Sequence, residues 1–150
     1  MSGQRLGKLA TYYSFGDLLI LPNASGIEPI EADISSRFTK KIALHLPIVS
    51  SPMDTVTESE MALEMARLGG IGVIHRNMSE AREVEEVRRV KSSKSGVETI
   101  DGEGRPAVAA AVGPFDAARA KALDSAGADV IVIDTAHGHN MNVVRSAKEI

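Results

Sequence analysis

Four short apolar runs that alternate with helical patterns constrain the fold of this chain more than any other feature. The runs span residues 46–50, 71–74, 107–112 and 130–133, and their starts are 25, 36 and 23 residues apart. Strands and helices that alternate at this spacing form parallel βα units. Each run is continuously apolar, which is typical of strands covered on both faces. The sequence therefore predicts an α/β domain with a parallel sheet.

Capping residues and apolar stripes predict a helix after each run. In the first helix, Thr57 and Glu60 form a capping-box pattern, and Gly69 supplies a left-handed stop. The other helices are predicted over residues 80–91, capped by Ser79, over residues 116–126, stopped by Gly127, and from Asn140 onward.

Two architectures accommodate four such units. A doubly wound sheet can be complete with four or five strands, whereas a (β/α)8 barrel needs at least ~200 residues. The chain has 150 residues, so length alone favours the open sheet. Residues 11–39 are predicted to be an irregular lead-in with short strands. The polar segment Ser92–Arg105, which contains three glycines, is the only candidate linker.

Composition excludes several classes of function. Lys and Arg number 17 against 20 Asp and Glu, so the sequence indicates no basic surface for nucleic acid or anionic lipid. No apolar run approaches the ~20 residues that cross a bilayer, and no secretory signal is visible, so a cytoplasmic protein is expected. The absence of cysteine excludes disulfides, thiolate metal sites and a thiol nucleophile within this sequence.

Polar clusters follow three of the apolar runs, at Ser50–Asp54, His75–Asn77 and Asp134–His139. Both architectures bind ligands at the carboxyl ends of parallel strands, so we expect these clusters to share one face. Asp134 suits a ribose hydroxyl or a carboxamide, and Met53 suits the face of a planar base. The alternative is structural: such residues also cap helices and form turns, Met53 can fill the core, and Asp134 can cap the helix from Asn140.

Metal and phosphate motifs are not evident in the sequence. His137 and His139 could reach one metal only from an extended loop, and no further ligand set accompanies them, so no metal site is expected. Gly69–Gly72 precedes a strand, which is the wrong place for a phosphate-binding helix start. This weakens the open nucleotide-binding sheet.

Three segments closely resemble the inosine monophosphate (IMP) dehydrogenase family. They are IVSSPMDTVTE at 48–58, GGIGVIHRNM at 69–78 and VIVIDTAHGH at 130–139. The resemblance implies a (β/α)8 barrel that oxidises IMP to XMP with NAD and water, through a covalent intermediate on a cysteine. Position by position, it implies that Ser51 and Met53 contact IMP and that Asp134, Thr135, Ala136 and His137 contact NAD.

The chain departs from that family in two ways. Residues 92–105 lie where the family usually carries a pair of regulatory CBS modules. Residues 1–150 match the lead-in and the first four βα units, so the cysteine loop, the phosphate-binding glycines, the potassium loop and the mobile flap are all outside the sequence. The resemblance thus implies half of a barrel, inactive alone and with no catalytic residue of its own, within a homotetramer.

Three alternatives stay open. The first is a non-catalytic half barrel that dimerises and binds purine nucleotides or serves in assembly. The second is the sister family of guanosine monophosphate (GMP) reductases, which differs around Ser51 and in the 134–139 loop and ranks lower. The third is an unrelated doubly wound domain.

Overall fold

The computed structural model describes residues 11–93, 96 and 98–150. The chain divides into two compact units, Met1–Ala32 and Asp33–Ile150. The described part of the first unit is exposed and contains two short 3₁₀ helices, η1 (Phe15–Asp17) and η2 (Pro29–Glu31). The lead-in is irregular, as predicted, and the short strands expected there begin only in the second unit.

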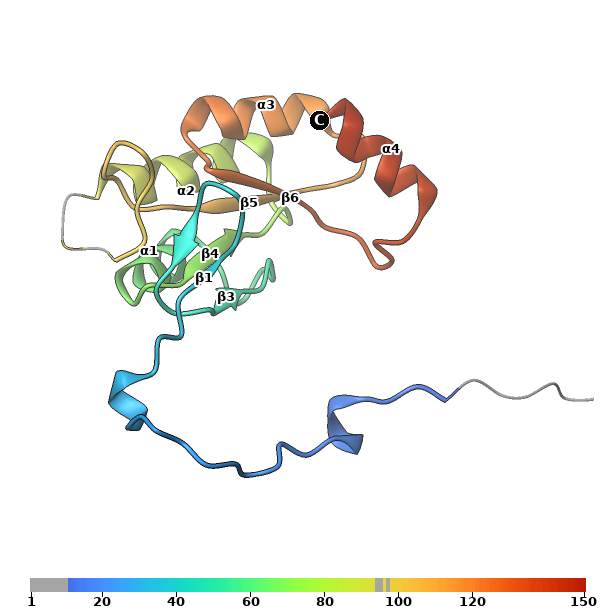
Figure 1. Cartoon of the computed structure of the whole chain (residues 1–150). Coiled ribbons are helices and arrows are strands. Elements are labelled where there is room, and N and C mark those ends of the chain that lie inside the picture. Colours follow the sequence, from blue (N-terminus) through green and yellow to red (C-terminus); the bar gives the residue numbers. More distant parts are fainter. Residues whose placement is uncertain (1–10, 94–95, 97) are drawn as a thin grey trace, which may run out of the picture. The chain divides into compact units, whose positions relative to one another are not determined.

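The second unit contains a parallel sheet of four strands (Figure 1). They are β3 (Val49–Ser50), β4 (Ile71–Ile74), β5 (Ala109–Val112) and β6 (Val130–Ile133). Each predicted run contains one strand, although the first and third strands are shorter than their runs. The strands are neighbours in chain order, without a reversal among the described residues. A doubly wound sheet requires a reversal, so the open sheet favoured by length lacks its switch point here.

The four predicted helices are present in the described part of the chain. They are α1 (Ser59–Arg67), α2 (Glu80–Ser92), α3 (Ala117–Ala126) and α4 (Met141–Glu149). Side chains of Ser79, Asp116 and Asn140 accept amide hydrogen bonds at the starts of the last three. Gly69 and Gly127 have positive φ angles of 90° and 102°, which confirms both glycine stops. None of these helices is long and apolar enough to cross a membrane.

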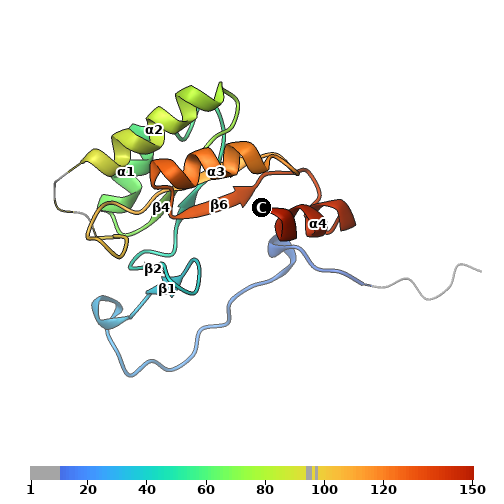
Figure 2. The ribbon, with the colours of Figure 1, turned by 90° about the horizontal axis from the view of Figure 1, so that it is seen from above.

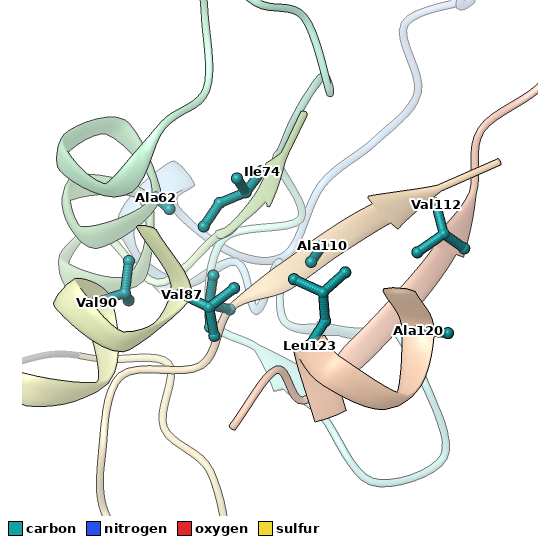
Figure 3. Close-up of a cluster of buried hydrophobic side chains, with 9 residues drawn as sticks. Ala62, Ile74, Val87, Val90, Ala110, Val112, Ala120 and Leu123 are labelled. Carbon is teal, nitrogen blue, oxygen red and sulfur yellow. The ribbon is translucent and has the colours of Figure 1, made fainter. Parts of the chain in front are cut away.

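The two central strands, β4 and β5, are buried on both faces, as their continuous apolar runs predict, whereas β3 and β6 at the edges are partly exposed. Side chains of α1, α2 and α3 cover one face, packing on Ile74, Ala110 and Val112 (Figure 3). On the other face, Ile71, Val73 and the alternate alanines of β5 meet a hairpin of β1 (Ser36–Arg37) and β2 (Ala43–Leu44). Figure 2 shows the three helices and the hairpin on opposite sides of the sheet.

Close packing of α1 on the sheet depends on Gly72. A Cβ atom at this position would lie 2.4 Å from the Ala62 Cα atom, far inside contact distance. The glycine therefore allows α1 to approach β4, whose carboxyl end leads into the polar segment 75–78.

The predicted linker at 92–105 is anchored at both described ends. Ser92 belongs to α2, and the amides of Glu98 and Thr99 each donate to the Ala66 carbonyl at 3.0 Å. The buried Lys91 Nζ lies 2.9 Å from Asp101 Oδ2 and 2.6 Å from Asp129 Oδ2. Burial alone would raise the pKa of Asp101, but hydrogen bonds from Arg105, Lys91 and Glu103 hold that pKa well below its usual range. The part of this segment after residue 97 is therefore tied to α1 and α2 through Ala66 and Lys91, although most of its residues are exposed.

Candidate functional site at the strand ends

The three predicted polar clusters meet at one end of the sheet. Asn77 Nδ2 donates to Asp54 Oδ2 at 2.9 Å, which joins the segments that follow β4 and β3. Arg76 Nε donates to Asp134 Oδ2 at 3.4 Å, which joins the segments that follow β4 and β6. The prediction of a shared face is thus confirmed, and residues 76 and 77 connect its two sides.

The segment after β3 is held by a buried threonine. Thr57 Oγ1 donates to the Ser51 carbonyl at 2.7 Å and lies 2.9 Å from Ser50 Oγ. These contacts correct the predicted capping box, because the Thr57 hydroxyl is engaged with the β3 segment and Glu58 occupies the N-cap of α1. The turn leaves the Ser51 side chain exposed and 55% of Met53 accessible, so Met53 is not core filler.

The segment after β4 is shaped by a buried histidine. The amide of Asn77 donates to His75 Nδ1 at 3.1 Å, so the ring proton lies on Nε2, which faces Glu58 Oε1 at 3.3 Å. Glu58 Oε1 also accepts from Arg82 Nη2 at 2.7 Å. His75 therefore ties the 75–78 segment to the start of α1 and does not face the shared rim as a free base.

The segment after β6 carries the other four predicted site residues. Asp134 and Thr135 are half-buried, whereas Ala136 and His137 are exposed. The N-cap of α4 is provided by Asn140, whose Oδ1 accepts from the Asn142 amide, so the alternative of Asp134 as the cap is wrong. The Asp134 carboxylate is 40% exposed beside Arg76 and remains accessible to a ligand.

The two histidines of this loop stack on each other, with ring centroids 6.5 Å apart. Across the part of the chain that the structure describes, no group of three or more His, Asp or Glu side chains is arranged to hold a metal ion.

A buried ion pair next to the rim was not predicted. Glu83 of α2 is fully buried, and its Oε2 accepts from Arg119 Nη1 of α3 at 2.9 Å. Burial raises the pKa of Glu83 to about 7, against the opposing effect of Arg119. The helical spacing of the sequence indicates that Glu83 is buried, because it lies four and seven positions before Val87 and Val90, on the buried stripe of α2.

The backbone after β5 also departs from expectation. Phe115 has a φ of 62°, unusual for an aromatic residue, and its amide donates to Oγ of the buried Ser146 at 2.7 Å. This contact fixes the second half of α4 to the loop that follows β5. No sequence signal indicates a positive φ at a phenylalanine.

A pocket of about 530 Å³ lies beside the β3 segment and the first turns of α1. It is lined by Asp54, Thr55, Val56, Glu58, Glu60, Met61 and Glu64. Four carboxylates make it unfavourable for a phosphate group. The rim at the strand ends is therefore the better candidate for an anionic nucleotide.

Comparisons with known proteins agree on one family. The family model described as the IMP dehydrogenase / GMP reductase domain matches residues 12–150. A Cryptosporidium parvum protein named inosine-5'-monophosphate dehydrogenase is 40% identical over all of this chain and 45% of its own length. A Mycobacterium tuberculosis protein of that name is 55% identical over 57% of this chain and 16% of its own length.

A Thermoplasma acidophilum protein, also named inosine-5'-monophosphate dehydrogenase, is 28% identical over the whole chain. The alignment runs over 262 positions against the 150 residues of this chain, so that relative carries a long stretch without counterpart here. The chain spans about half the length, or less, of the relatives it matches.

Proposed function

Because this chain belongs to the IMP dehydrogenase / GMP reductase family, we propose that it forms the amino-terminal half of a catalytic (β/α)8 barrel that oxidises IMP to XMP with NAD. The observation that carries this proposal is the double bridge from Asp54 through Asn77 and Arg76 to Asp134. It joins the segment proposed for IMP to the segment proposed for NAD. Strand order without a reversal supports a barrel as the complete architecture.

IMP is proposed to contact Ser51 and Met53. The exposed thioether of Met53 is soft and polarisable, which suits the flat face of a purine base. The Ser51 hydroxyl is a donor and acceptor for the ribose phosphate. The buried Thr57 hydroxyl fixes the turn that carries both residues.

NAD is proposed to contact Asp134, Thr135, Ala136 and His137. The chemistry of these residues fits a dinucleotide, because the accessible Asp134 carboxylate can accept from ribose hydroxyls and the exposed Ala136 leaves room beside it. Bound NAD supplies the hydride acceptor for the oxidation of IMP. Arg76 offsets the charge of Asp134 where an anionic ligand approaches.

The nucleophile of the reaction must come from elsewhere. The sequence contains no cysteine, so the residues described here bind and orient substrates but form no covalent bond with IMP. The potassium loop and the flap are proposed to accompany the missing cysteine. We also propose that the complete protein is a cytoplasmic tetramer. Residues 92–105 are proposed to stand in place of the regulatory CBS pair.

The test is NADH formation from IMP and NAD, measured with this chain alone and with a second chain that carries the carboxyl-terminal half of the Cryptosporidium parvum relative. We expect neither chain to form NADH alone and the two together to do so. NADH formation by this chain alone would contradict the proposal.

One observation favours a second candidate, a non-catalytic module that closes with another copy. The apolar residues of β6 are only half-buried, so the outer edge of the sheet is open to a partner strand. A dimer that binds IMP but never forms NADH with the complementing half would favour this candidate. Reduction of GMP by the complemented pair would instead favour a GMP reductase.

A further inference from the structure

The two bridges at the rim both originate from one short segment. Arg76 and Asn77 are adjacent in the segment after β4, yet their side chains extend to Asp134 and Asp54 on opposite sides. Both side chains are exposed, so packing of their own atoms does not fix these directions. The backbone of residues 76–78 must be held for the two bridges to form together.

Arg119 of α3 fixes this backbone through two hydrogen bonds. Its Nη1 donates to the Arg76 carbonyl at 3.0 Å, and its Nη2 donates to the Met78 carbonyl at 3.2 Å. These carbonyls flank Asn77, so one guanidinium grips the segment on both sides of it. The planar fork of arginine is suited to two acceptors at once, and Arg119 is only half-buried.

The guanidinium is itself held from two sides. Glu83 Oε2 accepts from Arg119 Nη1 at 2.9 Å inside the protein, and Asp116 Oδ2 lies 3.4 Å from Arg119 Nε. Glu83 Oε1 is buried without a hydrogen-bond partner among the described residues. Glu83 therefore holds Arg119 through Oε2 alone.

We propose that Arg119 is a positioning residue of the nucleotide site, clamping the carbonyls of Arg76 and Met78 so that Arg76 and Asn77 reach the two halves of the rim. This inference rests on the proposed function for the identity of the ligands. The clamp itself rests only on the contacts of Arg119. Arg119 touches neither proposed ligand segment, and it acts through residues 76–78.

The experiment is a set of substitutions in the full chain, read by NMR and by calorimetry with IMP and NAD. In Arg119→Gln, we expect shifted side-chain signals of Arg76 Nε–H and Asn77 Nδ2–H₂. We also expect IMP and NAD both to bind roughly tenfold more weakly, as lost charge-assisted hydrogen bonds predict. Arg119→Lys keeps the charge but lacks the planar fork, so it should restore the two signals and the two affinities only in part.

Two controls lie on the same helix. Lys121→Gln removes the same charge from an exposed position and should change neither readout. Leu123→Val weakens the buried core, against which Met78 also packs, but removes no hydrogen bond to residues 76–78. It should lower the melting temperature while leaving the Arg76 and Asn77 side-chain signals in place.

The proposal is overturned if Arg119→Gln leaves those signals unchanged, or if Leu123→Val shifts them equally. If the unsubstituted chain binds neither nucleotide, the proposed function fails, but the NMR signals of Arg119→Gln still decide whether the clamp exists.

Discussion

Arg76 Nε lies 3.4 Å from Asp134 Oδ2, although the two residues are 58 positions apart in the sequence. The contact spans from the end of β4 to the end of β6, past the intervening strand β5. It places a positive charge beside the carboxylate that is proposed to receive a ribose. Both side chains are about two-fifths exposed, so a ligand can reach either without opening the core.

Asp134→Ala is expected to weaken NAD binding by roughly tenfold to a hundredfold, because it removes an acceptor for ribose hydroxyls. IMP binding should change little, since Ser51 and Met53 lie on the other side of the rim. Calorimetry with each nucleotide separately measures both effects. Asp124→Ala, at an exposed position of α3, is the matched control. Equal losses for IMP and NAD in Asp134→Ala would argue against the assignment of Asp134 to NAD.

Thr57→Val is expected to lower the free energy of unfolding by about 1–3 kcal/mol. Valine keeps the shape of the side chain but removes the buried hydroxyl that contacts the Ser51 carbonyl and the Ser50 hydroxyl. IMP affinity should fall with it, since the turn that carries Ser51 and Met53 is released. Urea unfolding and IMP titration measure the two effects. Thr55→Val, in the same turn but exposed, should change neither stability nor affinity appreciably. An unaltered IMP affinity in Thr57→Val would contradict the proposed place of IMP.

Glu83 is expected to make stability depend on pH. Burial raises its pKa from the ordinary 4.5 to about 7, so the folded state binds more protons than the unfolded state between these values. Protonated Glu83 therefore contributes up to ~3 kcal/mol to the free energy of unfolding below pH 4.5. This contribution is lost as the pH rises through 7. Glu83→Gln should reduce the difference in unfolding free energy between pH 5 and pH 8. The same difference in both proteins would show that Glu83 does not titrate in this range.

Lys91→Met is expected to cost about 3–5 kcal/mol of stability, because it leaves the carboxylates of Asp101 and Asp129 near each other without their shared cation. The lowered pKa of Asp101 adds stability above its ordinary pKa, which is lost as the pH falls through the folded value. The penalty of Lys91→Met should therefore shrink in acid. Denaturant unfolding at neutral and acid pH tests this, with exposed Lys121→Met as the control. A penalty that does not change with pH would rule out the charge as its cause.

Local signals in the sequence predicted most of the second unit. Apolar runs located the strands, Ser79 and Asn140 located helix starts, and Gly127 located a helix end. Convergence of the polar clusters followed from parallel strands alone. Length favoured a doubly wound sheet, but the number of residues says nothing about strand order, and the four described strands follow chain order without the reversal of that fold.

Contacts between distant segments were not predictable in the same way. Thr57 matches a capping box locally, but its hydroxyl donates to the carbonyl of Ser51, in the turn that follows β3. The apolar stripe of α2 indicates that Glu83 is buried, but not that its partner is Arg119, 36 positions later. Such pairs depend on how α2 and α3 pack, which no local pattern encodes.

This chain is proposed to contribute the contacts to both nucleotides at one rim. A residue-resolved NMR titration of the chain with IMP and with NAD tests this. We expect IMP to shift the signals of Ser51 and Met53, NAD to shift those of residues 134–137, and Asn77 to respond to both. Signals at the rim that do not move with either nucleotide, or shifts confined to the acidic pocket beside α1, would contradict it.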